Sequence, residues 1–225
     1  RLSKYFQESE YGEVGDKLHG ARLGVNITNK TNYVKLSAPN IFAETPVQWM
    51  CAAEVYFLRA EGRLHGWNMG GEMEGLYNTG ITKSFEQWGV SLGDYLTRGD
   101  EYKPVPFTAP SGTTGSAVAA STITIAWNAV DRDEKKLERI ITQKWIAMFP
   151  EGQEAWSEYR RTGYPKLFNL YGTNASSGQV DASGPRRIPL PSTEYDTNTT
   201  EVNKAVTDFL GGKDYGNVKL WWDKK

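Results

Sequence analysis

The chain has 225 residues, a formal net charge of −1 at pH 7 and 24% charged residues, with both signs spread along the sequence. This balance excludes the basic stripe with which proteins bind a phosphate backbone. All apolar runs are far shorter than the roughly 18 residues of a membrane-spanning helix. The single cysteine, Cys51, excludes a disulfide framework within the chain, and we expect it to be a small buried apolar side chain.

The N-terminal segment is predicted to be irregular and to lead into a long helix. Residues 1–40 show no helical period, and the alternation over 33–36 predicts a short strand there. The first clear helix is predicted to begin at Thr45, a suitable N-cap with Gln48 placed to complete a capping box, and to end at Gly66. Its buried face is marked by apolar residues at helical spacing: Ala53, Tyr56, Phe57, Ala60 and Leu64.

A second helix is predicted over residues 72–96, with a bend or break near Gly89. Its apolar stripe has spacings of four, four and three: Tyr77, Ile81, Phe85 and Trp88. The two helices form a predicted antiparallel pair over 45–96. The alternation of small and large residues on the first helix is typical of helical-repeat units.

The middle of the chain predicts a long loop followed by a second helix pair. Residues 97–130 are rich in Pro, Gly, Ser and Thr, and the alternation over 122–127 predicts a short strand. An amphipathic helix then begins near Asp131, breaks at Pro150, and is followed by a shorter helix that ends before Pro165. We assign four tryptophans to the helix cores: Trp49, Trp88, Trp145 and Trp156.

The C-terminal part, residues 166–225, is predicted to be rich in loops, with one last helix over about 198–210. Two arginine pairs, 160–161 and 186–187, are expected to bond carbonyls and carboxylates of irregular segments rather than to bind an anion. The whole pattern predicts a mostly α fold: tetratricopeptide-like antiparallel helix pairs, a long irregular remainder and minor short strands, in one domain over 1–225.

The sequence offers no convincing catalytic, metal or cofactor site. The two histidines have no zinc-binding spacing, and no nucleophile elbow or phosphate-binding loop is present. Carboxylate pairs such as Glu54 and Glu61 keep a glycoside hydrolase open as a weaker alternative. We therefore expect a protein that is not an enzyme and that binds no cofactor and no metal.

The surplus of aromatic residues is the more informative signal, with eight Trp and twelve Tyr. Tryptophan and tyrosine faces stack on sugar rings, while neighbouring polar side chains bond the hydroxyls. Candidate glycan contacts lie in or next to predicted loops: Trp67, Asn68, Trp127, Asn128 and Tyr33. For each of these side chains taken alone, packing is the favoured explanation over ligand contact. A helical scaffold that binds a protein partner without a sugar site is the main alternative.

Seven blocks of the sequence follow one another along the chain: Ala53–Glu61 (AEVYFLRAE), Gly80–Phe85 (GITKSF), Ile140–Ala147 (IITQKWIA), Glu154–Pro165 (EAWSEYRRTGYP), Arg186–Pro191 (RRIPLP), Gly211–Asp214 (GGKD) and Trp221–Asp223 (WWD). In these blocks and in their order, the chain resembles the SusD/RagB nutrient-binding lipoproteins of the Bacteroidetes outer membrane. Together the blocks are specific, and they cover the chain from about Pro39 to its end. The ligand-contacting aromatics of the family lie outside such blocks, so none is carried over by motif.

The resemblance implies a tetratricopeptide-like helical fold and a non-enzymatic role. Such a protein captures an oligo- or polysaccharide at the cell surface and passes it to a SusC-like TonB-dependent transporter in the outer membrane. Family members are anchored by a lipidated N-terminal cysteine, whereas Cys51 lies within a predicted helix. We therefore expect this chain to be the C-terminal portion of a larger surface-exposed protein whose lipid anchor lies outside it.

Overall fold

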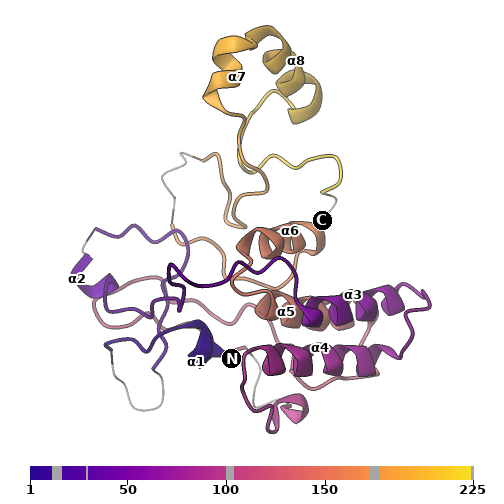
Figure 1. Cartoon of the computed structure of the whole chain (residues 1–225). Coiled ribbons are helices and arrows are strands. Elements are labelled where there is room, and N and C mark those ends of the chain that lie inside the picture. The colour runs from indigo at the N-terminus through magenta and orange to yellow at the C-terminus, as the bar shows by residue number, and fades with distance from the viewer. Residues whose placement is uncertain (12–16, 29, 100–103, 173–177, 224–225) are drawn as a thin grey trace. The chain divides into compact units, whose positions relative to one another are not determined.

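The computed structural model describes residues 1–11, 17–28, 30–99, 104–172 and 178–223 (Figure 1). Regular secondary structure in these ranges is helical: α1 (Leu2–Tyr5), α2 (Lys30–Tyr33), α3 (Ala52–Leu64), α4 (Met73–Gln87), the 3-10 helix η1 (Tyr95–Thr97), α5 (Asp133–Ala147), α6 (Gly152–Thr162), α7 (Ser192–Thr197) and α8 (Thr199–Leu210). The prediction of a mostly α fold built on antiparallel helix pairs is confirmed. No helix of the described ranges is long and apolar enough to cross a membrane.

The chain divides into two compact units. The larger unit comprises Arg1–Gly20 and Asn29–Leu167, with α1 to α6, and the smaller unit comprises Ala21–Thr28 and Phe168–Lys225, with α7 and α8. The single domain over 1–225 stays a prediction.

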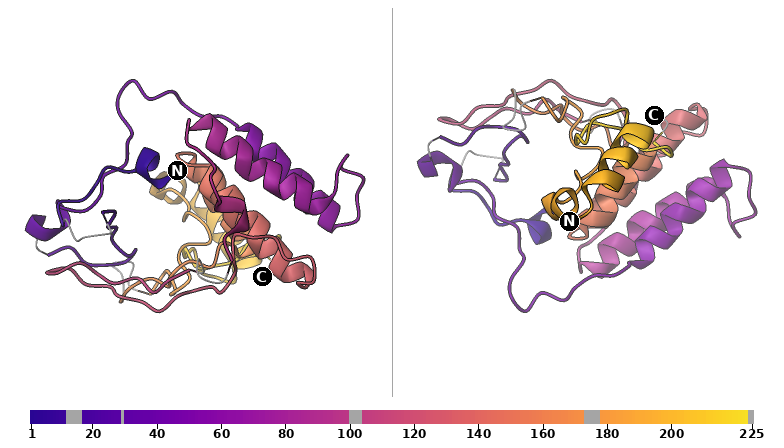
Figure 2. Two further views of the ribbon diagram at one scale, coloured as in Figure 1. Left: turned by 90° about the horizontal axis from the view of Figure 1, so that it is seen from below. Right: turned by 90° about the horizontal axis from the view of Figure 1, so that it is seen from above.

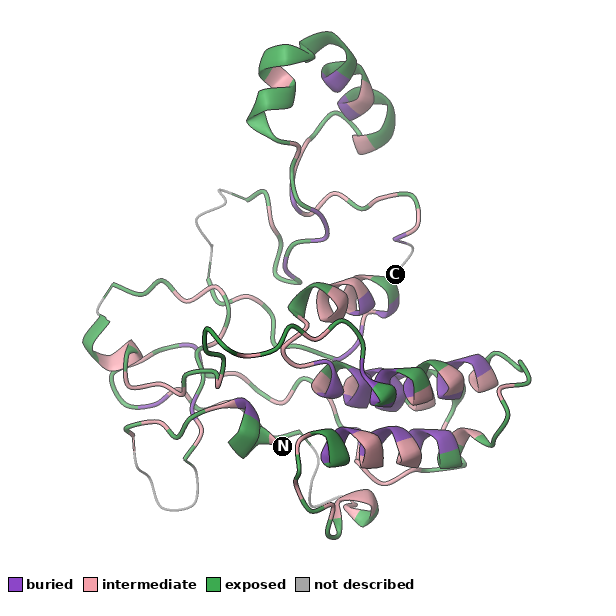
Figure 3. Cartoon of the chain, in the orientation of Figure 1, coloured by how far each residue is buried: buried purple, intermediate pink, exposed green. Residues whose placement is uncertain are grey.

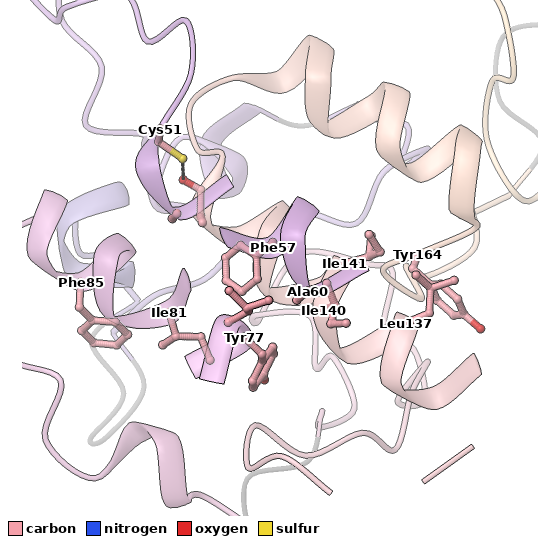
Figure 4. Packing of buried hydrophobic residues seen from close by; sticks show 13 residues of the cluster. Cys51, Phe57, Ala60, Tyr77, Ile81, Phe85, Leu137, Ile140, Ile141 and Tyr164 are labelled. Atoms are coloured by element: carbon pink, nitrogen blue, oxygen red, sulfur yellow. Dashed lines mark hydrogen bonds between the residues drawn. The ribbon is translucent and has the colours of Figure 1, made fainter. Parts of the chain in front are cut away.

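The core of the larger unit lies where α3, α4 and α5 meet (Figures 2 and 3). Figure 4 shows the side chains of this cluster, which include Phe57, Ala60, Tyr77, Ile81, Phe85, Leu137, Ile140 and Ile141. The ring of Phe57 lies directly on Gly80, where an added Cβ would stand 2.8 Å from Cε1 of that ring. The absence of a side chain at Gly80 therefore permits close packing of α3 against α4, although glycine inside a helix is less favourable than alanine.

Helix α3 begins at Ala52, so the predicted start at Thr45 and its capping box are wrong. Thr45 instead closes a turn with Phe42, whose backbone N–H donates to Thr45 Oγ1 at 2.8 Å. The side chain of Gln48 donates to the carbonyl of Met148 at 3.3 Å. Because both polar side chains bond groups outside the helix, neither caps it, and Cys51 occupies the N-cap position.

Neither short strand predicted from the sequence forms in the described residues. Tyr33 ends helix α2, and residues 34–36 form a turn and a bend directly after it. Side chains of α4 and α5 bond the carbonyls of the predicted strand 122–127: Arg139 Nε donates to Thr124 O at 3.0 Å, and Tyr77 Oη donates to Ile125 O at 2.7 Å. These carbonyls therefore have no need of a neighbouring strand.

The break predicted near Gly89 is confirmed, and Gly89 has a left-handed φ of +59° that favours glycine. Helix α4 ends at Gln87 and does not resume, so its predicted extent to residue 96 is wrong, and only the 3-10 helix η1 follows. Helix α8 agrees with the helix predicted over about 198–210, whereas α7 has no counterpart in the prediction. Helices α5 and α6 form the predicted second pair, with Gly163 in a left-handed conformation at the end of α6. Two tryptophans differ from prediction: Trp49 precedes α3 and is 91% exposed, and Trp145 of α5 is 36% exposed, so their assignment to the helix cores is wrong.

The smaller unit is held by the second arginine pair, as expected from the sequence. Arg186 donates to the buried carboxylate of Asp223, with 2.7 Å between Nε and Oδ2. Arg187 donates to Asp214, which also accepts a hydrogen bond from the hydroxyl of Tyr195. These charge-assisted bonds join segments that have no regular structure.

Candidate functional site

The loop between α3 and α4 presents an aromatic side chain on a firmly held backbone. Arg59 of α3 donates to the carbonyls of Met69 (2.9 Å) and Gly70 (3.2 Å). The backbone N–H of Trp67 donates to Gly62 O at 3.0 Å, which continues the helix end into the loop. The indole of Trp67 is 62% exposed, so an apolar ring face is available to a ligand without rearrangement of the loop.

Asn68 lies beside this indole and shapes the loop. Its side-chain oxygen accepts a hydrogen bond from the backbone N–H of Gly70 at 3.3 Å. Gly70 has a φ of +68°, which closes the turn at little conformational cost. The ring of His65 stands 5.6 Å from that of Trp67. The surface of this loop therefore combines an indole, an imidazole and an amide, groups that suit a sugar ring and its hydroxyls.

The second candidate pair, Trp127 and Asn128, has structural partners. The half-buried ring of Trp127 packs on Tyr77 with a centroid distance of 5.1 Å, and the guanidinium of Arg139 lies 6.0 Å from it. Asn128 accepts from the backbone N–H of Val130 at 3.1 Å, in the turn that precedes α5. Trp127 therefore offers less free ring surface than Trp67.

Tyr33, the fifth candidate, belongs to a small aromatic and amide cluster at the end of α2. Its hydroxyl accepts from the backbone N–H of Thr114 at 3.4 Å. The neighbouring Asn32 donates to Gly112 O at 3.0 Å and accepts from the hydroxyl of Tyr11 at 2.8 Å. This cluster fastens the N-terminal segment to the loop that carries Thr114.

The structure does not gather the five candidates into one site. Helix α2, which ends at Tyr33, and the α3–α4 loop, which carries Trp67, lie at opposite ends of the larger unit (Figures 1 and 2). A single sugar unit cannot contact both residues. The candidates therefore mark separate surfaces, of which the Trp67 loop is the most exposed.

The carboxylates that kept a hydrolase open are engaged in a buried ion network. Lys144 is 1% exposed and places Nζ 3.4 Å from Glu54 and 3.3 Å from Glu158. Arg161 binds both oxygens of Glu61, at 2.6 and 2.7 Å, and also donates to Glu158 at 2.8 Å. The network joins α3, α5 and α6, which gives these acidic side chains a structural role.

The network also shifts the acidity of its members. Burial raises the pKa of Glu54, although the charge of Lys144 opposes this rise. Burial also acts to raise the pKa of Glu158, but hydrogen bonds from Arg161 and the charge of Lys144 outweigh it and lower that pKa. Elsewhere in the described ranges, no group of three His, Cys, Asp or Glu side chains is placed to hold a metal ion.

Two cavities beside α1 have no counterpart in the sequence-based predictions. One is an apolar groove of about 220 Å³ whose walls include Tyr5, Trp145 and Phe149. The other is a more polar cavity of about 500 Å³. Leu2 and Phe6 line both cavities. Neither has a local sequence signal, because segments distant in the chain form their walls.

A family model described as SusD and RagB outer membrane lipoprotein matches residues 1–223 of the chain. Among solved structures, a SusD homologue from Bacteroides uniformis is 43% identical with a TM-score of 0.90, and the match covers 99% of this chain and 46% of that one. A SusD homologue from Bacteroides thetaiotaomicron is 39% identical with a TM-score of 0.88, covering 99% and 48%.

A third structure is a chitin-binding SusD homologue from Flavobacterium johnsoniae, with 41% identity and a TM-score of 0.85 over 99% of this chain and 46% of that one. The chain thus spans about half the length of the solved structures it matches. No curated protein matches the chain.

Proposed function

The chain belongs to the family of SusD and RagB outer-membrane lipoproteins, and on this basis we propose that it binds an oligo- or polysaccharide at the bacterial cell surface, leaves the glycan chemically unchanged, and serves its delivery to a SusC-like TonB-dependent transporter. The observation that carries the proposal is the family match over residues 1–223. A relative at 41% identity that is described as chitin-binding supports a glycan as the ligand. Attachment to the membrane through a lipid anchor outside this chain is part of the same proposal.

Trp67 and Asn68 are the proposed first contacts with the glycan. An exposed indole on a loop held by Arg59 loses little conformational freedom when a sugar ring stacks on it. Trp127, Asn128 and Tyr33 are proposed as contacts for more distant units of a long glycan, at the separate surfaces described above.

The absence of catalysis is proposed from the state of the acidic side chains. A glycosidase needs one carboxyl group as acid and another as base or nucleophile on either side of the bond that breaks. Glu54 is held by Lys144, and Glu61 is held by Arg161, so both face structural cations instead of an open cleft.

Isothermal titration calorimetry of the protein with chitohexaose, cellohexaose and maltohexaose tests the proposal. We expect binding to at least one of them, and mass spectrometry should recover that glycan intact after prolonged incubation. Release of reducing ends would instead indicate a hydrolase. Failure to bind a broad panel of glycans, with no transporter that co-purifies from the outer membrane, would contradict the proposed function.

A further inference from the structure

The cavity of about 500 Å³ beside α1 has the size of a small-molecule site. It belongs entirely to the larger unit, and its walls come from α1 and the chain directly after it, from residues 17–18 and from Asn40. None of the five candidate glycan contacts lines this cavity. The cavity is therefore separate from the proposed glycan contacts.

Backbone hydrogen bonds hold the walls of this cavity in place. Gln7 N donates to Ala38 O at 2.8 Å, and Asn40 N donates to Tyr5 O at 2.8 Å, so two extended segments run antiparallel. On a third segment, Lys17 O accepts from Ser9 N at 2.8 Å. The backbones of Gln7, Lys17 and Asn40 are thus each fixed by a bond to another segment, which suits a preformed ligand site.

The side chains of the cavity combine an apolar face with hydrogen-bonding groups. Phe6 and Glu8 are alternate residues of an extended segment, so they lie on the same side of it. Lys17 Nζ bonds both carboxylate oxygens of Glu8, at 3.1 and 3.2 Å. Asn40 uses its side-chain nitrogen to bond Lys4 O at 3.1 Å, and its side-chain oxygen remains an acceptor.

The charges of the cavity favour a neutral ligand with many hydroxyl groups. Glu8 and Lys17 cancel each other, so the pair attracts neither an anion nor a cation strongly. An ammonium group has three donor hydrogens and a carboxylate has about four acceptor positions, so both can bond further hydroxyls while they remain paired. The ring of Phe6 supplies the apolar surface against which the C–H face of a pyranose packs.

We propose that this cavity is a second sugar-binding subsite that takes a neutral mono- or disaccharide unit, with Phe6 against the sugar ring and Glu8, Lys17 and Asn40 bonding its hydroxyls. The inference rests on the glycan-binding function proposed above, which it deepens by adding a subsite and a ligand class. Because the cavity and the Trp67 loop share no residue, the subsite binds short sugars independently of Trp67.

The test is calorimetric titration of the protein with chitobiose, cellobiose and maltose, which are short enough to fill this cavity alone. The double variant Glu8→Ala/Lys17→Ala is expected to weaken binding of the best disaccharide by about tenfold, through loss of charge-assisted bonds. Phe6→Leu, which keeps an apolar side chain, is expected to weaken it by about threefold. The control Lys204→Ala breaks a surface ion pair on α8, outside the cavity, and should leave binding unchanged.

The outcomes separate this inference from the proposed function. Weaker disaccharide binding in the cavity variants, with normal binding in the Lys204→Ala control, supports the subsite. Unchanged disaccharide binding in both cavity variants, or no disaccharide binding while hexasaccharides still bind, overturns the subsite and leaves the proposed function intact. If neither disaccharides nor hexasaccharides bind, both fall. Circular dichroism melting of each variant identifies any loss that comes from unfolding.

Discussion

Lys144 provides the sharpest test of how the three central helices are held together. Its ammonium group lies between Glu54 of α3 and Glu158 of α6, and the side chain is almost fully buried. The variant Lys144→Met keeps the length of the side chain and removes the charge, which leaves the Glu54 carboxylate without its cation. Glu158 keeps Arg161, so the loss falls mainly on Glu54.

We expect Lys144→Met to lower the free energy of unfolding by about 3 kcal/mol at pH 7, the lower end of what breaking a buried ion pair costs. The matched control is Lys204→Met, whose ion pair with Asp208 is exposed and should change stability by less than about 0.5 kcal/mol. Urea denaturation followed by circular dichroism gives both values.

The pH dependence supplies a second readout. Burial raises the pKa of Glu54, and loss of the Lys144 charge, which lowers that pKa, should raise it further in the variant. The folded variant then binds a proton that the unfolded chain does not, so its deficit should shrink as pH falls from 7 to 5. A deficit below about 1 kcal/mol at pH 7, or one that grows on acidification, would refute this account of the network.

Two further predictions concern the packing and the charges of the larger unit. Gly80→Ala places a methyl group against the Phe57 ring and should lower the unfolding free energy by about 1–3 kcal/mol, whereas Gly75→Ala, in open space on the same helix, should change it by less than about 1 kcal/mol in urea titrations. Equal effects would show that helix propensity, and not packing, governs both sites. The pKa of Glu158 is lowered in the folded protein, so its carboxylate stabilises the fold above the unfolded pKa of about 4.3, and this stabilisation is lost as pH falls through the folded pKa. Glu158→Gln should therefore lower the free energy of unfolding by about 3 kcal/mol at pH 7 and by progressively less below pH ~4. A pH-independent deficit would contradict this assignment.

Local periodicity was sufficient to predict the helix pairs. The stripes on α3, α4 and α5 follow directly from apolar residues three and four positions apart, and these residues form the core. The start of α3 was wrong because Thr45 and Gln48 have good capping chemistry but bond partners outside the helix. A local motif cannot reveal that competition.

Features made by distant segments could not be predicted. The segment 122–127 alternates like a strand, yet its carbonyls accept hydrogen bonds from Tyr77 of α4, distant in sequence, and from Arg139 of the helix that follows it. The polar cavity depends on backbone pairing between residues near Gln7 and near Ala38, which has no periodic signal. Trp67 lies in a loop, as predicted. Hydrogen bonds from Arg59 hold this loop, and the Trp67 side chain is exposed.

The central claim is that this chain binds a glycan through an exposed indole, and calorimetric titration of Trp67→Ala tests it most directly. With the best hexasaccharide of the panel, we expect the dissociation constant to rise about tenfold relative to the unaltered protein, which corresponds to about 1.4 kcal/mol. The control Trp49→Ala removes an equally large exposed indole outside the proposed site and should bind normally. Equal affinity of Trp67→Ala and the unaltered protein, or a loss only in Trp49→Ala, would contradict the claim.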